Sequence, residues 1–196
     1  ERIDCLYFLA DDDAETTQVL EGAAFARVDD RVTLVLQPIP PVSSRPADTR
    51  PACVNDISAL RDIAAVSHYD SRFYNDRHFT RHQCDELYRV WIEKSCQGWA
   101  DHVVVVERDG SAIGYLTVHL REPNTASVGL VGVAPAYRRQ GIGARLMGGA
   151  LAWISSQSVG RVWTATQGRN AASQAYFQEA GFRPTGRAIW YHRWFS

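Results

Sequence analysis

The chain has 196 residues, 45% of them hydrophobic and 22% charged, and a formal net charge of −1. This length and composition are typical of a soluble protein with one main domain, and the near-neutral charge excludes the basic field with which proteins attract nucleic acids or anionic membranes. No apolar run approaches the ~20 residues of a membrane helix, and the scattered cysteines, without a CxxC pair, favour free thiols in the cytoplasm over zinc knuckles or disulfides.

The first 37 residues are expected to form a strand-helix-strand unit. The apolar run 5–10 predicts a strand, and the acidic triplet 11–13 can start a helix that ends at Gly22. The β-branched run 31–37 predicts a second strand. Residues 38–53 contain five prolines and are expected to be a linker. The predicted organisation is therefore a small N-terminal subdomain (1–37), a Pro-rich linker (38–53) and a main domain (54–196).

The main domain is expected to contain both strands and helices around one sheet. Helices are predicted at about 55–67, 85–96, 143–157 and 170–180, and strands at 102–107, 112–120, 127–133, 161–166 and, as one or two strands, 185–195. Asp109-Gly110 between the first two of these strands is a strong hairpin signal. This order predicts an α+β fold with a mixed central sheet flanked by helices.

A glycine-rich loop joins the strand at 127–133 to the next helix, and residues 138–143 read Arg-Arg-Gln-Gly-Ile-Gly. Gly141 and Gly143 let the backbone approach a ligand, and the unpaired N–H groups at the helix start, up to Ala144, form an anion site. A dinucleotide fingerprint would need glycine at Leu146, and a P-loop would need Lys followed by Ser or Thr, so neither fits. A turn that binds nothing is the remaining alternative.

The loop resembles the (Gln/Arg)-x-x-Gly-x-(Gly/Ala) signature of the GNAT N-acetyltransferases at every position. Residues 170–182, NAASQAYFQEAGF, resemble the second signature of that superfamily. The order and spacing of the two signatures argue against a chance match. The resemblance covers about 54–195 and implies the GNAT fold with acetyl-CoA as acyl donor. Because residues 19–36 resemble 176–193, the unit 1–37 would be a truncated GNAT-like subdomain.

The resemblance also implies roles for particular residues. Acetyl-CoA would lie where the strands 127–133 and 161–166 separate. The expected cofactor contacts are Leu130, Val131, Val133, Arg138, Arg139, Gln140, Gly141, Ile142, Gly143, Ala144, Asn170 and Ser173. The acceptor amine would attack the thioester directly, and Tyr176, whose phenol is ordinarily protonated below a pKa of about 10, would protonate the departing thiolate. The alternative is that Tyr176 is only a packing aromatic.

The general base is left open by the sequence. Many relatives use a glutamate on the strand that corresponds to 127–133, but this strand has no ionisable side chain here. The candidates elsewhere are His119, Glu122, His68, Asp70 and His102. An amine of low pKa needs only water to deprotonate it, so a dedicated base is not required.

The segment 55–98 resembles the bacterial dTDP-fucosamine acetyltransferases, which acetylate the 4-amino group of a dTDP-linked 4-amino-4,6-dideoxyhexose. The resemblance rests on the Ser-Arg-Phe stretch at 71–73, the Tyr-x-x-Trp-Ile-Glu motif at 88–93, the aromatic strand at 189–191 and the appended N-terminal unit. It implies the acceptor residues Arg72, Phe73, Tyr74, Trp91 and His119. Arginines at 72, 77, 81 and 89 beside aromatic residues suit a nucleotide diphosphate. The alternative is surface arginines over an aromatic core stripe.

Two other functions are compatible with the same motifs. One is an acetyltransferase for another small amine, a peptide or an aminoglycoside, whose acceptor pocket should be acidic. The other is a non-catalytic GNAT protein that binds acyl-CoA. His78 and His82 lack a third ligand nearby, so no metal is expected. The expected partners are a small-molecule acceptor and, as one option, a second copy of the chain in a homodimer, without nucleic acid or membrane.

Overall fold

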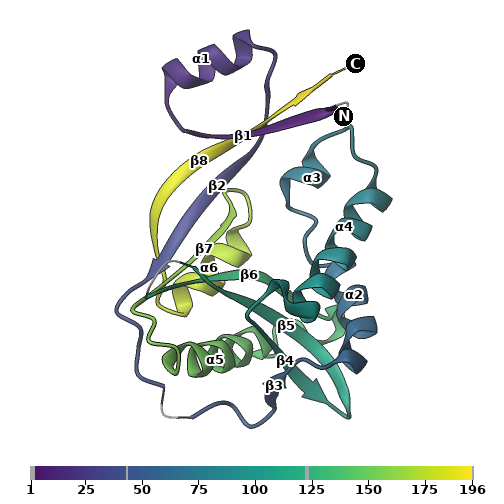
Figure 1. The fold of residues 1–196 in the computed structure, drawn as a ribbon, viewed down its shortest axis with the longest axis vertical. Coiled ribbons are helices and arrows are strands. Elements are labelled where there is room, and N and C mark those ends of the chain that lie inside the picture. Colours follow the sequence, from purple (N-terminus) through teal and green to yellow (C-terminus); the bar gives the residue numbers. More distant parts are fainter. Residues whose placement is uncertain (1–2, 43, 122–123, 196) are drawn as a thin grey trace.

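The computed structural model describes residues 3–42, 44–121 and 124–195, and its strands form one mixed sheet (Figure 1). The order across the sheet is β1-β8-β2-β7-β6-β5-β4-β3. The strands are β1 (Cys5–Asp11), β2 (Ala26–Leu36), β3 (Thr49–Pro51), β4 (His102–Arg108), β5 (Ser111–Leu120), β6 (Thr125–Val133), β7 (Arg161–Gln167) and β8 (Arg183–Trp194). The helices are α1 (Ala14–Gly22), α2 (Ile57–Ala65), α3 (Arg72–Asn75), α4 (Arg81–Lys94), α5 (Ile142–Ser155) and α6 (Ala171–Glu179), with short turns η1 (Val54–Asp56), η2 (Ser95–Trp99) and η3 (Pro135–Tyr137). The predicted α+β class is confirmed.

The two central strands, β6 and β7, run parallel but stay paired only at their beginnings. Their register runs from Thr125 opposite Arg161 to Ser127 opposite Trp163, whereas the strands themselves continue to Val133 and Gln167. A register shift between β5 and β6 falls beside this point and bends β6 locally, as β-bulges do. The predicted separation of the strands 127–133 and 161–166 is therefore confirmed.

Helices cover the two faces of the sheet and enclose two separate cores (Figure 1). Leu146, Ala150 and Ile154 recur every four residues along α5, so that one stripe of this helix packs against the sheet. On the other face, α2 and α4 pack against each other and bury side chains such as Leu60 and Ile92. Each such leucine or isoleucine stabilises the fold by about 1.5–3 kcal/mol.

The N-terminal residues form the expected strand-helix-strand arrangement, and its strands join the common sheet. Asp13 caps α1, because its Oδ1 accepts a hydrogen bond of 2.8 Å from the N–H of Thr16. The helix buries Leu20 against Ile189 and Tyr191 of β8. β1 pairs with β8, and β2 lies between β8 and β7. The division of the chain into units 1–37, 38–53 and 54–196 stays a prediction.

Some element bounds differ from the sequence-based prediction for identifiable reasons. The Pro-rich segment contains a short strand, β3, which pairs with β4 through its residues Thr49 to Pro51. Helix α4 begins at Arg81 rather than Asp85, because Thr80 and Gln83 form a reciprocal capping box. The C-terminal region 183–194 is one continuous strand. In the part of the chain that is described, no helix has both the length and the apolar character needed to cross a membrane.

Candidate active site

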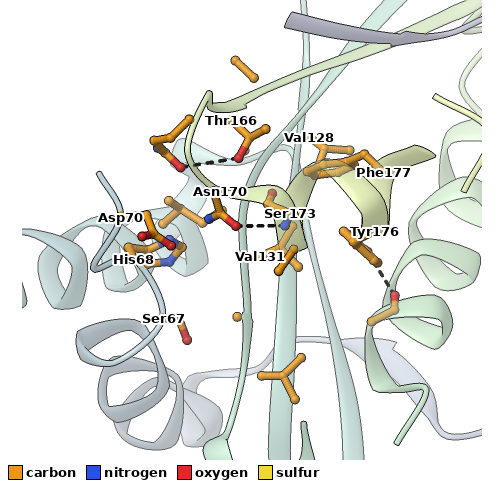
Figure 2. Close-up of a pocket in the computed structure, with 18 of the residues that line it drawn as sticks. Ser67, His68, Asp70, Val128, Val131, Thr166, Asn170, Ser173, Tyr176 and Phe177 are labelled. Carbon is orange, nitrogen blue, oxygen red and sulfur yellow. Dashed lines mark hydrogen bonds between the residues drawn. The ribbon is translucent and has the colours of Figure 1, made fainter. Parts of the chain in front are cut away.

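A cavity of about 1260 Å³ opens where β6 and β7 separate. One end is lined by the loop before α5 and the first turns of α5 and α6. The other end is lined by residues 67–73, side chains of α4, two residues of β2, and single residues of β5 and β8. In Figure 2, Tyr176 points toward α5, Asn170 and Val131 lie in the middle, and His68 and Asp70 lie on the opposite side. The cavity therefore joins the predicted cofactor and acceptor regions.

The loop before α5 presents backbone N–H groups to the first of these ends. Gly141 is the N-cap residue with φ of 75°, a left-handed conformation that glycine adopts without steric cost. Because Gly141 has no side chain to cap the helix, the first-turn N–H groups face the loop, where the helix dipole favours an anion. Ile142, Gly143 and Ala144 line the cavity together with Gly141.

The polar side chains of this loop have different surroundings. Arg138 and Arg139 both line the cavity. The Arg138 guanidinium donates to the carbonyl oxygens of Val133 (3.1 Å) and Val66 (2.8 Å), which ties β6 to the end of α2. The Gln140 side chain instead donates to the carbonyl of Ala136 (2.9 Å). Gln140 does not line the cavity, so its predicted cofactor contact is not favoured by this geometry.

Tyr176 and Gly143 are packed against each other. The Tyr176 hydroxyl donates a hydrogen bond of 3.0 Å to the carbonyl oxygen of Gly143. A Cβ atom on Gly143 would lie 2.9 Å from Tyr176 Cε2, so only glycine admits the ring at this distance. Burial raises the pKa of Tyr176 well above that of an ordinary tyrosine. The phenol is therefore a neutral hydrogen-bond donor across the physiological pH range.

The middle of the cavity is bounded by α6 and the edge of β6. Asn170 caps α6, since its Oδ1 accepts a hydrogen bond of 2.9 Å from the N–H of Ser173. The N–H of Leu130 donates to Thr117 Oγ1 (2.8 Å) and is satisfied within the sheet. The N–H of Ala134 likewise bonds to β5. Backbone groups alternate along a strand, so those of Val131 and Val133 face the gap left by β7.

The other end of the cavity contains a partly buried guanidinium inside an aromatic enclosure. The Arg72 guanidinium carbon lies 3.9 Å from the ring centroid of Trp190, 4.4 Å from that of Phe73 and 5.4 Å from that of Tyr7. Its Nε is buried and forms no hydrogen bond with the described residues. Burial lowers the pKa of Arg72, but an arginine stays charged. This positive charge lacks an ion-pair partner within the described chain.

Two further arginines reach the same end. Arg31 of β2 is partly buried, lines the cavity and lies 5.7 Å from the ring centroid of Trp163. Arg121 follows β5 and donates to Ser127 Oγ (3.1 Å). The nearby carboxylate of Asp29 is already paired with Arg169 at 2.7 Å. Positive charge therefore predominates at this end of the cavity.

The predicted acceptor residues are only partly brought together. Arg72, Phe73, Trp91 and His119 line the cavity. Tyr74 does not, because its hydroxyl donates to Asp85 Oδ1 at 2.5 Å and its ring lies within the α2–α4 core.

The other arginines of the segment 72–91 are not part of the cavity lining either. Arg77 and Arg81 are exposed on the surface. Arg89 pairs with Glu86 at 3.5 Å, one helical turn away. For these three, the alternative interpretation of surface arginines holds, and Arg72 alone of the set faces the cavity.

The base candidates are also separated by the structure. His68, Asp70 and His119 line the cavity. His102 lies elsewhere and stacks on Trp153, with ring centroids 4.6 Å apart. Glu122 lies outside the described residues.

Sequence reasoning missed several residues that line the acceptor end. These are Asp29, Arg31, Trp99, Arg121, Trp163 and Trp190. Their positions depend on the insertion of β2 between β8 and β7, which no local motif reveals. The alternation of charged and apolar residues along β2 is a signal that Arg31 faces away from the core, but it does not indicate the cavity.

Comparison with known proteins agrees with this architecture. The acetyltransferase (GNAT) family model matches residues 61–182. The spore coat polysaccharide biosynthesis protein SpsD of Bacillus subtilis (strain 168) is 25% identical over 139 residues, which are 71% of this chain and 48% of SpsD. The chain thus spans about half the length of this relative.

Solved structures share the fold at low sequence identity. A GNAT-family acetyltransferase from Novosphingobium aromaticivorans DSM 12444 has a TM-score of 0.66 at 15% identity, over 98% of this chain and 75% of its own. A GCN5-related N-acetyltransferase from Sphaerobacter thermophilus has a TM-score of 0.64 at 15% identity, over 97% of this chain and 59% of its own. The shared fold and the family model agree with each other. The chain belongs to the GNAT acetyltransferase family, as the two sequence signatures predicted.

Proposed function

We propose that the protein transfers the acetyl group of acetyl-CoA to the primary amine of an anionic sugar acceptor, the 4-amino group of a dTDP-linked 4-amino-4,6-dideoxyhexose being the best match. One observation carries the proposal. A single cavity joins the uncapped start of α5 and a partly buried tyrosine to an end lined by arginine and tryptophan.

The donor half of the cavity has the groups that acetyl-CoA requires. The pyrophosphate would accept hydrogen bonds from the first-turn N–H groups of α5, with the exposed Arg139 beside them. The pantetheine amides would pair with the backbone of Val131 and Val133. This pairing would satisfy strand-edge groups that β7 leaves unpaired beyond Ser127, although the Val133 carbonyl already accepts a hydrogen bond from Arg138. Asn170 and Ser173 would contact the same arm.

The chemistry proposed is direct transfer. The acceptor nitrogen attacks the thioester carbonyl carbon, the C–S bond breaks, and the thiolate takes a proton from Tyr176. Rotation about the phenolic C–O bond would turn the Tyr176 hydrogen from the Gly143 carbonyl toward the thiolate. A phenol kept neutral by burial is suited to this role as an acid.

The acceptor half favours a diphosphate over a polycation. The positive charges of Arg31 and Arg72 would attract phosphate groups and repel polyamines or aminoglycosides. Trp91, Trp99 and Trp190 provide flat apolar surfaces for a base or a sugar ring. The similarity to SpsD, named for polysaccharide biosynthesis, supports a sugar acceptor. An acidic pocket, which the small-amine alternative requires, is not what this end presents.

Acetyl-CoA binding at α5 is testable through Gly141. Valine does not tolerate φ of 75°, so Gly141→Val should turn the loop N–H groups away and weaken CoA binding at least about tenfold. Gly160→Val is the matched control, because a Cβ there meets nothing within 4 Å and its φ is ordinary. Calorimetric titration with CoA gives the affinities. Equal affinity of the Gly141 variant and the wild type, with both folded, would remove this site.

The acceptor assignment is testable with an amine panel. We expect kcat/KM for a dTDP-linked 4-aminohexose to exceed that for free lysine, spermidine or an aminoglycoside by at least about a hundredfold, which corresponds to roughly 3 kcal/mol. A release assay for the CoA thiol measures each rate. A preference for spermidine would contradict the acceptor while leaving acetyl transfer intact. Binding of acetyl-CoA without turnover of its thioester, with any acceptor or with water, would favour the non-catalytic alternative.

A further inference from the structure

His119 is held by the protein in one tautomer. Its Nδ1 lies 3.1 Å from the carbonyl oxygen of Trp99. A carbonyl oxygen only accepts hydrogen bonds, so Nδ1 carries the ring proton and Nε2 keeps its lone pair. Burial, followed by the positive charge of Arg121, lowers the pKa of this imidazole. His119 is therefore a neutral ring with a free acceptor nitrogen.

The free nitrogen lies against β6 where this strand has left β7. A Cβ on Gly129 would lie 3.0 Å from His119 Nε2, so the ring edge rests directly on the backbone of Gly129. Gly129 follows Ser127, the last residue of β6 that pairs with β7. Both Gly129 and His119 line the cavity. Nε2 therefore lies beside the gap in which the thioester is proposed to bind.

Two other titratable groups of the cavity, His68 and Asp29, are less suited to accept a proton. His68 bonds through Nε2 to the hydroxyl of Tyr115 (2.9 Å) and stacks on Tyr88. Burial lowers its pKa to about 4. Asp29 is occupied by its ion pair with Arg169. Of these three groups, His119 combines a fixed tautomer with a ring nitrogen, Nε2, for which no hydrogen bond is found among the described residues.

We propose that His119 Nε2 is the catalytic base that takes the proton from the acceptor amine, an assignment that rests on the proposed acetyl transfer. As the acceptor nitrogen forms its bond to the thioester carbon, one N–H proton passes to Nε2. The C–S bond then breaks with its electron pair on sulfur, which takes the Tyr176 proton. The imidazolium afterwards releases its proton to water, and Tyr176 regains one from water. One amide and one thiol are formed.

The groups around His119 determine where its pH effect should appear. Arg121 lowers its pKa, whereas the Trp99 carbonyl and Asp101, which accepts from the N–H of Leu120, raise it. Ser127, opposite on β6, is neutral. Burial and Arg121 outweigh the two groups that raise the pKa, so the pKa of His119 lies below the usual value of 6.5. A base must be unprotonated, so kcat should fall as the pH drops below about 6.5.

The test compares His119→Asn with His102→Asn. The asparagine amide can still donate to the Trp99 carbonyl but offers no basic nitrogen. His102 is a half-buried histidine outside the cavity lining. We expect His119→Asn to lower kcat by about a hundredfold, the lower range for a lost general base, and to abolish the acidic limb of the pH profile. The KM for acetyl-CoA should stay within about twofold. His102→Asn should keep the wild-type rate and profile.

Chemical rescue separates a proton acceptor from a structural residue. Added imidazole should raise the kcat of His119→Ala at least about tenfold. The increase should be proportional to the concentration of neutral imidazole. A loss of less than threefold in His119→Asn would overturn the assignment. A larger loss of rate would also overturn it if the acidic limb of the pH profile is unchanged and imidazole gives no rescue. These two results together would indicate that His119 has a structural role. If the wild type acetylates no amine of the panel, the proposed function fails as well; normal wild-type transfer with normal His119 variants rejects only the base.

Discussion

Tyr176→Phe is expected to lower kcat by about a hundredfold or more and to leave the KM for acetyl-CoA nearly unchanged. The substitution keeps the ring that packs against Gly143 and removes only the hydroxyl. A leaving-group donor acts in the transition state, where general acid catalysis contributes 10²- to 10⁴-fold. Because burial raises the pKa of Tyr176, this residue should stay protonated up to at least about pH 10, the ordinary tyrosine value. The kcat of the wild type should therefore not fall through deprotonation of Tyr176 below that pH.

Tyr191→Phe is the matched control for this prediction. Its hydroxyl also bonds to one partner, Thr17 Oγ1 at 3.0 Å, but it lies in the core under α1. Each substitution should cost about 1 kcal/mol of unfolding free energy, measured by urea denaturation. Only the Tyr176 variant should lose kcat in steady-state assays at saturating acetyl-CoA. A change below about threefold in that variant would mean that water protonates the thiolate.

The donor half of the site was predictable because its signals are local. Gly141 and Gly143 indicate a helix start whose backbone N–H groups are not covered by side chains. Asn170 is three residues from the N–H that it caps. The role of Tyr176 was predicted through the resemblance of residues 170–182 to the second GNAT signature. In each case the residues that define the feature are close in sequence, so a short motif is enough to predict it.

The acceptor half was less predictable because it is built by long-range pairing. Arg31 and Trp190 come from opposite ends of the chain and meet through the register of β2 with β8. Neither strand carries a motif that fixes this register. Tyr74 shows the converse error: its sequence position beside Arg72 suggested a shared role, but the turn of α3 directs its hydroxyl to Asp85.

The same long-range assembly would give the N-terminal residues a part in the proposed function. Without β2, the acceptor end would lose Arg31 and Asp29. The ion pair between Asp29 and Arg169 also links β2 to the loop before α6, which carries the predicted pantetheine contact. The N-terminal residues would therefore form one wall of the proposed acceptor site.

Arg72→Met should raise the acceptor KM by about tenfold to a hundredfold and leave the acetyl-CoA KM within about twofold. A charge-assisted hydrogen bond to a phosphate contributes roughly 1.5–3 kcal/mol, which corresponds to this range. Methionine keeps the apolar contact with Trp190 and Phe73 that the arginine side chain makes. The folded protein should therefore not lose stability, and removal of a partly buried charge without an ion-pair partner should leave Tm unchanged or higher.

Arg193→Met is the matched control, because Arg193 also lies over aromatic rings, 4.9 Å from the Phe195 centroid, but does not line the cavity. It should not change either KM. Raising the salt concentration should increase the acceptor KM of the wild type more than that of Arg72→Met, since screening weakens only the charged contact. If Arg72→Met instead lowers Tm and keeps a normal acceptor KM, Arg72 is a structural residue. An anionic acceptor would then have to be held by Arg31 and Arg121.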